Sequence, residues 1–307
     1  MLRKSTVERP LVTFRIGRSS IRIPLHTLLL TPAMFVLFLV IAYPVIGSAI
    51  LGFFNYNLTE PWNTGFAGLD NFAALTVDQN FWKALYNTLI FTFGSVAVSL
   101  VLGLVIALAI DQLPAKFGGL RGLILLPWII PTVVVGYLFV YIFDVEVGVA
   151  NYILQKLHIV EDYLPWLMRG NLAMTACIIA NVWNQTPFYV LMFAAGLKTI
   201  PQDVKEATFE MGASRWQEFI HVTLPYLRGI MVITSLLMII RNFNNFPIVF
   251  TMTGGGPAYE TTTFVVYIYR LAFENFELGY SGAVGFIWCV VLAALAALYV
   301  RLLTKDF

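Results

Sequence analysis

Long apolar runs alternate with short polar segments along the 307 residues of the chain. Six runs reach the roughly 20 residues that an α-helix needs to cross a bilayer. They are too long and too poor in charge for a water-soluble core, and in lipid the backbone of each must pair within itself. The pattern predicts an all-α polytopic membrane protein with six transmembrane helices. The predicted spans are Leu25–Phe54, Ala84–Ile110, Leu120–Phe143, Leu172–Leu197, Tyr226–Phe250 and Leu278–Leu303.

The composition agrees with this prediction. Charged residues make up 12% of the chain and hydrophobic residues 59%, whereas about 25% of a typical soluble domain is charged. We therefore expect membrane lipid around the chain and no nucleic-acid partner. Cys177 and Cys289 fall inside predicted spans, where they are expected to be small packing residues. His26, His158 and His221 are too scattered to form a metal site.

Basic residues are distributed unevenly about the six spans. Fourteen of the 19 lysines and arginines fall on one side, and six of these precede the first span. Because basic loops remain in the cytoplasm, both termini are predicted to be cytoplasmic. The predicted organisation is a basic tail (1–24), a first helix with an outer loop (25–83), a core (84–303) and a short C-terminus (304–307).

Prolines punctuate several of the predicted spans, among them Pro127 and Pro131 in the third, Pro187 in the fourth and Pro247 in the fifth. Proline removes a backbone donor and kinks a helix. Such kinks are compatible both with ordinary helix packing and with helices that bend around a pathway.

The cytoplasmic loop 198–225 carries two short helical patterns separated by Gly212. Thr199 with Gln202, and Ser214 with Gln217, have the spacing of capping boxes. The first helix would place Val204, Ala207 and Met211 on one face. By helix content alone, the loop is equally compatible with an amphipathic segment lying on the membrane surface.

The order of residues within this loop is more specific. Glu206-Ala207, Gly212 at the sixth position after the glutamate, and Leu224-Pro225 resemble the EAA loop of permease subunits in binding-protein-dependent ABC importers. Thr208 and Val222 depart from the usual alanine and isoleucine. The resemblance implies that the first helix docks in a groove of an ATPase subunit. The implied coupling residues are Glu206, Ala207, Thr208, Gly212, Trp216, Phe219, Leu224 and Pro225.

A second signature follows the fifth predicted span. Thr251-Met252-Thr253-Gly254-Gly255-Gly256-Pro257 and the later segments 261–263 and 267–273 resemble the outer loop of maltose-type permeases. As bare chemistry, the glycine run is only a flexible turn. Together with the EAA loop, the resemblance covers about residues 84–303 and implies the type I ABC importer permease fold.

Polar side chains inside the spans are candidates for solute contacts, because buried polar groups are costly unless they are used or paired. Asn242 and Asn245 are three residues apart and would share a helix face. The resemblance implies that this pair contacts the sugar, and further matching positions fall in the fourth span. Those positions are Asn184, Gln185 and Phe188, with Tyr189 beside the position of the family's tyrosine. The alternative is that the amides only bridge neighbouring helices.

Arg241 lies within the fifth predicted span, beyond the midplane from the cytoplasmic side. Two roles are open for it. It would either pair with Asp144 or Glu146 at the outer end of the third span, or face an anionic solute such as a sugar acid or glycerol phosphate.

These observations predict a transport subunit and no enzyme. The chain has no Gly-x-x-x-x-Gly-Lys-Ser/Thr loop for ATP, so it is expected to bind no cofactor, with ATP and Mg held by partner subunits. The expected partners are an ABC ATPase dimer, a second related permease, an extracytoplasmic substrate-binding protein and a sugar or polyol substrate. The expected location is a bacterial or archaeal cytoplasmic (inner) membrane. The rival hypothesis is a self-sufficient secondary transporter or facilitator, although the repeats or intramembrane acids typical of such proteins are missing from the sequence.

Overall fold

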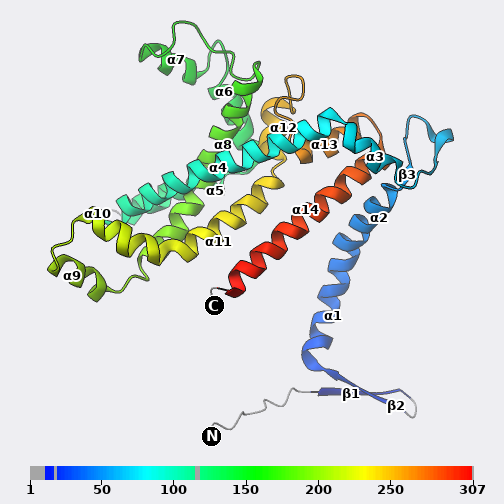
Figure 1. The fold of residues 1–307 in the computed structure, drawn as a ribbon, viewed down its shortest axis with the longest axis horizontal. Coiled ribbons are helices and arrows are strands. Elements are labelled where there is room, and N and C mark those ends of the chain that lie inside the picture. Colours follow the sequence, from blue (N-terminus) through cyan, green and yellow to red (C-terminus); the bar gives the residue numbers. More distant parts are fainter. Residues whose placement is uncertain (1–10, 17–18, 115–117, 306–307) are drawn as a thin grey trace.

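The computed structural model describes residues 11–16, 19–114 and 118–305 as an elongated bundle of helices (Figure 1). The helices are α1 (Leu25–Leu37), η1 (Phe38–Ala42), α2 (Tyr43–Leu51), η2 (Pro61–Asn63), α3 (Asp70–Val77), α4 (Gln79–Asp111), α5 (Gly118–Ile129), α6 (Thr132–Ile142), α7 (Val149–Lys156), α8 (Gly170–Leu197), α9 (Gln202–Glu210), α10 (Arg215–Glu218), η4 (Phe219–Thr223), α11 (Leu224–Phe243), α12 (Pro247–Thr253), α13 (Phe264–Tyr269), η5 (Arg270–Glu274) and α14 (Leu278–Lys305). The turns η1, η4 and η5 are π-helical, and η2 is a 3₁₀ turn.

Four of the six predicted spans correspond to helices that continue without a break. The first is α1, η1 and α2 in succession, and the second, fourth and sixth are α4, α8 and α14. Over the described residues, four helices are long and apolar enough to cross a membrane, or five if the bent pair α5–α6 is one span. α8 is not among them, because Asn181, Asn184 and Gln185 lower its hydropathy. The total of six spans and the cytoplasmic termini therefore remain predictions.

The third predicted span is sharply bent. α5 and α6 meet at an angle of 97°, and Pro131 precedes the first residue of α6. Because Pro131 has no N–H, the carbonyl oxygen of Pro127 lacks the donor that a continuing helix would supply. The side-chain amide of Asn184 donates to that oxygen instead, over 2.7 Å. The expected proline kink is confirmed here, whereas α8 runs on through Pro187.

The fifth predicted span is two helices. α11 ends at Phe243 and α12 begins at Pro247, so Asn244, Asn245 and Phe246 form a break between them. The prediction of one helix through Phe250 is therefore wrong, since Pro247 favours a new first turn over the continuation of the old helix.

Two short β-hairpins depart from the all-α prediction. β1 (Leu11–Ile16) pairs antiparallel with β2 (Ser19–Pro24), and β3 (Phe54–Asn55) pairs with β4 (Gly65–Phe66). Segments 12–16 and 20–23 alternate apolar and polar residues at the period of two that favours a strand. The basic tail was predicted from charge alone, which does not report this alternation.

The closest helix pair is α4 with α8. α4 presents a stripe of small residues at steps of three or four, which lie on one face of a helix. The stripe consists of Ala84, Thr88, Thr92, Ser95, Ser99, Gly103 and Ala107, all buried. A Cβ atom placed on Gly103 would overlap the Cβ of Tyr189 on α8. Small residues of this kind allow helix backbones in a membrane to approach closely.

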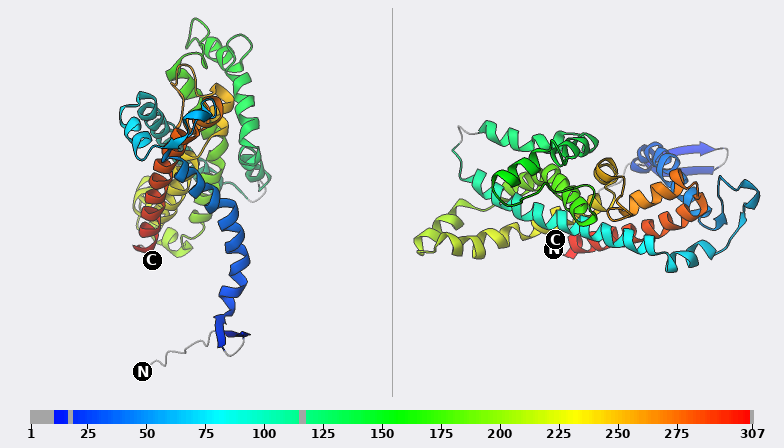
Figure 2. Two further views of the ribbon diagram at one scale, coloured as in Figure 1. Left: turned by 90° about the vertical axis from the view of Figure 1, so that its right-hand side faces the viewer. Right: turned by 90° about the horizontal axis from the view of Figure 1, so that it is seen from above.

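The first span stands apart from this bundle. None of its most apolar window is buried, and Figure 1 and the left-hand view of Figure 2 show α1 leaving the other helices. Only its outer end is held, where α2 packs against α14. A Cβ on Gly282 would lie 2.5 Å from the backbone oxygen of Ser48, so this contact also requires glycine. The rest of the first span therefore presents an uncovered apolar surface.

Asp78 links the start of α4 to the short helix α13 and to α14 by hydrogen bonds. Its carboxylate accepts hydrogen bonds from the hydroxyl groups of Tyr267 and Tyr280, the latter at 2.7 Å, and from the backbone N–H of Asn80. Partial burial by itself would raise the pKa of Asp78, but the hydrogen bonds to its charged form outweigh burial and lower the pKa. The pKa of Glu277 is raised by burial and by the charge of Asp78.

Gly103→Val is expected to destabilise the protein by about 1–3 kcal/mol, because the added atoms overpack the α4–α8 contact. The measurement is the Tm of the purified protein in mild detergent, followed by intrinsic fluorescence. Gly47→Val is the matched control, since a Cβ at Gly47 meets no atom within 4 Å. Equal Tm values for the two variants would contradict the packing described here.

Asp78→Asn is expected to lower the Tm at neutral pH, because the charged form of Asp78 accepts the hydrogen bonds of two tyrosines. A carboxyl group with a lowered pKa stabilises the fold above its ordinary value of 3.8 and loses this contribution as the pH falls through its folded-state pKa. The Tm difference between wild type and variant should therefore shrink below about pH 4. A difference that stays constant down to pH 3 would show that the charge is not involved.

Candidate functional site

The loop between α8 and α11 forms two short helices at one end of the bundle (Figure 1). In α9, Val204 and Thr208 face inward, and the Thr208 hydroxyl donates to the Val204 carbonyl oxygen at 2.7 Å. Glu206 and Ala207 are exposed. Of the three residues predicted to share one face, Val204 is half-buried, whereas Ala207 and Met211 are exposed. The exposed residues form a surface that a partner can reach.

Two turns fix how this surface is presented. Gly212 follows α9 with φ = 74°, a left-handed conformation that costs other residues more than glycine. Ser214 and Gln217 form the predicted capping box at the start of α10. The other predicted box is wrong: α9 begins without a side-chain cap, and the Thr199 hydroxyl donates to the Gly196 carbonyl oxygen instead.

Aromatic and apolar side chains are displayed around these turns. Trp216 is 68% exposed, Phe209 55% and Met211 79%. The Trp216 ring lies 5.5 Å from that of Phe219. Behind them, a groove of about 890 Å³ runs between α4 and the two short helices, and Lys205 reaches Asp111 of α4 across it at 3.7 Å. Leu224 and Pro225 then begin α11, so α10, η4 and α11 follow one another without an intervening loop.

An amide cluster joins α8 to the break between α11 and α12. The side-chain amide of Asn181 donates to Asn242 at 3.0 Å, and that of Asn245 donates to Asn181 at 2.9 Å. All three residues are buried. Asn245 lies beyond the end of α11, so the two predicted amides do not share a helix face but converge on Asn181. Sequence reasoning missed Asn181, although it precedes Asn184 and Gln185 by three and four residues.

The other predicted solute contacts are also interior residues. Gln185 donates to the Ser99 hydroxyl of α4 at 2.9 Å, and Asn184 donates to Pro127 as described above. Each leaves its amide oxygen buried without a partner among the described residues. Tyr189 is fully buried, whereas Phe188 is partly exposed and packs against Trp128 with ring centroids 5.5 Å apart. Phe188 is thus the member of this group that is accessible in the present conformation.

Aromatic rings cluster immediately beyond the break. Phe246 stacks on Phe250 at 4.6 Å, both lie within 5.0 Å of Tyr269, and Tyr269 lies 5.1 Å from Phe273. Phe273 is 66% exposed. Arg241 is partly buried in the last turn of α11, just before the same break. Of the two roles left open for Arg241, the pairing with Asp144 or Glu146 does not form, and Asp144 accepts instead from the backbone N–H of Glu146 and Val147.

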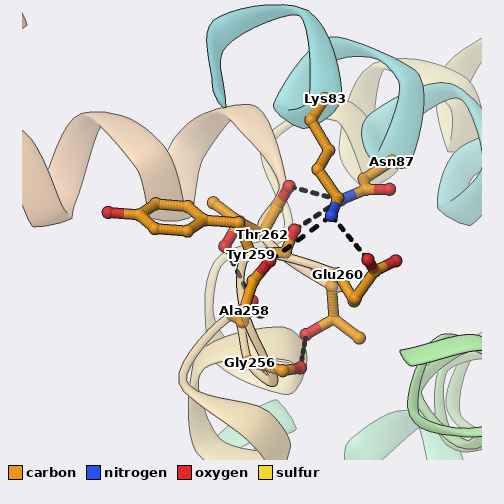
Figure 3. A network of polar contacts seen from close by, with 9 residues as sticks. Lys83, Asn87, Gly256, Ala258, Tyr259, Glu260 and Thr262 are labelled. Atoms are coloured by element: carbon orange, nitrogen blue, oxygen red, sulfur yellow. Dashed lines mark hydrogen bonds and ion pairs between the residues drawn. The ribbon is translucent and has the colours of Figure 1, made fainter. Parts of the chain in front are cut away.

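The glycine-rich outer loop is held by side chains of α4 and by its own threonines. Lys83 forms an ion pair with Glu260 at 2.6 Å, and Asn87 donates to the carbonyl oxygens of Tyr259 and Thr262 at 3.0 and 3.1 Å (Figure 3). Gly254 and Gly255 adopt positive φ. The Thr262 hydroxyl donates to the carbonyl oxygen of Gly255 at 2.7 Å. Hydrogen bonds therefore fix this loop, and the expectation of a flexible turn is wrong.

Taken together, the broken spans, the interior amides and the exposed two-helix element are typical of a membrane permease. The comparison with protein families gives the particular family. Residues 99–306 match the model of the binding-protein-dependent transport system inner membrane component, and the chain belongs to this family. It is therefore a multi-pass membrane component of such a transport system.

Relatives cover nearly the whole chain. A sulfoquinovosyl glycerol transport permease of Agrobacterium fabrum is 33% identical, over 92% of this chain and 91% of its own length. A trehalose/maltose transport permease, MalF of Thermococcus litoralis, is 31% identical, over 89% and 92%. Among solved structures, a chain of a bacterial ABC transporter that imports the acidic polysaccharide alginate has a TM-score of 0.72 at 22% identity, covering 92% of this chain and 95% of that one. The chain thus has the fold of a type I ABC importer permease.

Asn181→Leu is expected to lower the stability of the bundle, because it removes both hydrogen bonds of the amide cluster. Interhelical hydrogen bonds in membranes contribute about 0.6 kcal/mol each on average, so the loss should be on the order of 1 kcal/mol. Asn171→Leu, at an exposed position near the start of α8, is the control. A Tm for Asn181→Leu equal to that of the control would show that the cluster does not hold the helices together.

Proposed function

We propose that this chain is one of two permease subunits that together enclose the pathway of an ATP-driven importer for a sugar or related polyol. Its family and fold support an importer subunit. The carbohydrate class is supported by relatives named for sulfoquinovosyl glycerol, for trehalose and maltose, and for diacetylchitobiose. A relative named for sn-glycerol-3-phosphate keeps a polyol phosphate within the proposal.

The observation that carries the coupling role is the exposed surface of α9 and α10. An importer subunit without its own ATP site must receive work from outside, and a compact element continuous with a span transmits a rigid push. Glu206 and Ala207 lie on the exposed face, Gly212 sets the turn, and Trp216 is an exposed aromatic anchor of the kind found at interfaces. We propose that this surface docks on an ATPase dimer, which holds ATP and Mg.

A second permease is proposed for two physical reasons. The most apolar window of the first span, which runs from Thr27 to Leu51, is not buried by any other part of its own chain. This surface is therefore available to lipid or to a helix of a partner subunit. The amides predicted to contact the solute also pack against helices of the same chain. A pathway enclosed on all sides therefore requires a second subunit. We propose six spans with both termini in the cytoplasm. A substrate-binding protein on the outer side would deliver the solute, as in the alginate transporter solved with its periplasmic protein.

The proposed solute contacts lie around the break between α11 and α12. Carbohydrates bind amides, which both donate and accept hydrogen bonds, and aromatic faces. Asn242, Asn245, Asn184 and Gln185 supply amides, each with interior partners in this conformation. Phe188 and the Phe246–Tyr269 cluster supply accessible rings. We propose that ATP-driven movement of α11 relative to α8 breaks the hydrogen bonds between these amides and their interior partners, so that the amides can bind the solute. The aromatic rings would line the pathway in both conformations.

The test of the coupling role is Gly212→Asp. We expect the variant to insert normally but to lose uptake, because it places a side chain at positive φ and adds a negative charge to the docking surface. Gly212→Asn, which tolerates this φ and adds no charge, should retain more uptake. Gly65→Asp, in open space on the outer loop, should behave as wild type.

The measurement is purification of the tagged chain from its native membrane in mild detergent, followed by identification of the associated subunits. We expect an ATPase and a second permease with the wild-type chain, and loss of the ATPase with Gly212→Asp. Saccharides that stimulate ATP hydrolysis then identify the solute. A chain that purifies alone and carries solute into liposomes without ATP would instead support the facilitator hypothesis.

A further inference from the structure

We propose that Arg241 binds an anionic group of the transported solute, so that the natural substrate is a carbohydrate or polyol bearing a carboxylate, sulfonate or phosphate. This inference rests on the proposed importer function and narrows its substrate class. It is drawn from the charge, position and surroundings of one side chain.

Arg241 has no anionic partner within the described part of the chain. Three other cations there reach carboxylates: Lys83 pairs with Glu260, Lys205 with Asp111, and Arg270 with Glu274. No ion pair and no side-chain hydrogen bond joins the Arg241 guanidinium to any described residue. Acidic residues of the described segments lie at the ends of the helical spans or outside them, so the bundle interior cannot supply the missing charge.

The position of Arg241 makes an unpaired charge costly. It lies about 26 Å along α11 from Leu224 at the usual helical rise, and α12 continues the span beyond it. A cation at the centre of a transmembrane helix costs about 2.5–3.5 kcal/mol on insertion scales, and Arg241, two residues before the end of α11, costs less than this. The last carbonyls of α11 offset a further part of the cost, because a helix C-terminus contributes roughly half a unit charge. A partly buried cation without a carboxylate partner among the described residues is therefore a position that favours a bound anion.

Arg241 lies at the edge of the face by which α11 packs on the bundle. Leu237, Arg241 and Asn244 follow at steps of four and three residues, and Leu237 and Asn244 are exposed. Thr234, Met238 and Arg241 also follow at steps of four and three residues; Thr234 and Met238 are buried against the bundle, and Arg241 is partly buried. The guanidinium therefore lies between the covered face of α11 and its exposed stripe, at the border of the proposed pathway.

The break beside Arg241 favours a solute anion over a fixed one. Broken helices at membrane depth are tolerated where they line a cavity, and transporters bind solutes at such breaks. The exposed Asn244 and the ring of Phe246 follow Arg241 within five residues, and Tyr269 lies 5.0 Å from that ring. A guanidinium, an amide and aromatic faces together match a charged carbohydrate. A neutral sugar would need only the last two.

The experiment uses the complete complex with its binding protein, reconstituted into liposomes. The probes are digalacturonate, sulfoquinovosyl glycerol and sn-glycerol 3-phosphate as anions, and trehalose and maltose as neutral solutes. We expect at least one anion to be taken up and the neutral solutes to be taken up at least tenfold less efficiently. Arg241→Gln should lower kcat/KM for that anion about tenfold or more, since bonds between charged groups contribute 1.5–3 kcal/mol, and Arg241→Lys should restore part of it.

Arg228→Gln, on the same helix near its other end, is the matched control and should leave uptake unchanged. Subunit composition and Tm of each variant are measured in parallel. Release of the second permease by Arg241→Gln would show that the arginine pairs with a carboxylate of that subunit, which overturns the inference. Uptake of neutral solutes alone, or unchanged uptake of the anion by Arg241→Gln, also overturns it and leaves the importer function standing. A complex that takes up none of the probes would count against both the anion-binding role of Arg241 and the proposed importer function.

Discussion

The close approach of α4 and α8 is the contact on which the rest of the structure depends. Its small-residue stripe lets two long helices lie against one another, with Gly103 directly beneath Tyr189. In lipid, apolar side chains gain little by leaving the solvent, so packing and hydrogen bonds must hold helices together. This pair fixes the frame against which α11, with the two short helices α9 and α10 before it, and the glycine-rich loop are positioned.

The bundle carries polar groups where a structural protein would avoid them. Asn181, Asn184, Gln185 and Asn242 are buried, and three of these four leave a side-chain atom without a partner among the described residues. Such groups are costly in a low-dielectric interior. The hydrogen bonds of these interior side chains are thus incomplete in the conformation described. Incomplete hydrogen bonding is compatible with helices whose polar side chains change partners during transport.

Several site residues were predictable, and the reasons differ from residue to residue. The EAA order marked α9, Gly212 and α10, and the structure places that element at the surface with its capping box intact at Ser214. Asn242 and Asn245 do meet in one interior cluster, but not on one helix face as predicted, because α11 ends at Phe243 and Pro247 begins a new helix; their contact with a solute stays a prediction. Asn181 and the rings around Tyr269 were missed, since nothing in local spacing shows which helices meet.

The sequence alone determined the class of protein. Apolar runs of membrane length, the uneven distribution of basic residues and the residue order of the loop 198–225 are properties of the sequence. They do not depend on how the helices are arranged. Which face of each helix is covered was decided only by the tertiary structure. Whether Asp144 neutralises Arg241, whether Pro127 finds a donor and whether Ala207 points in or out depend on contacts between segments far apart in the chain. Helical periodicity gives the faces of a span but not their neighbours.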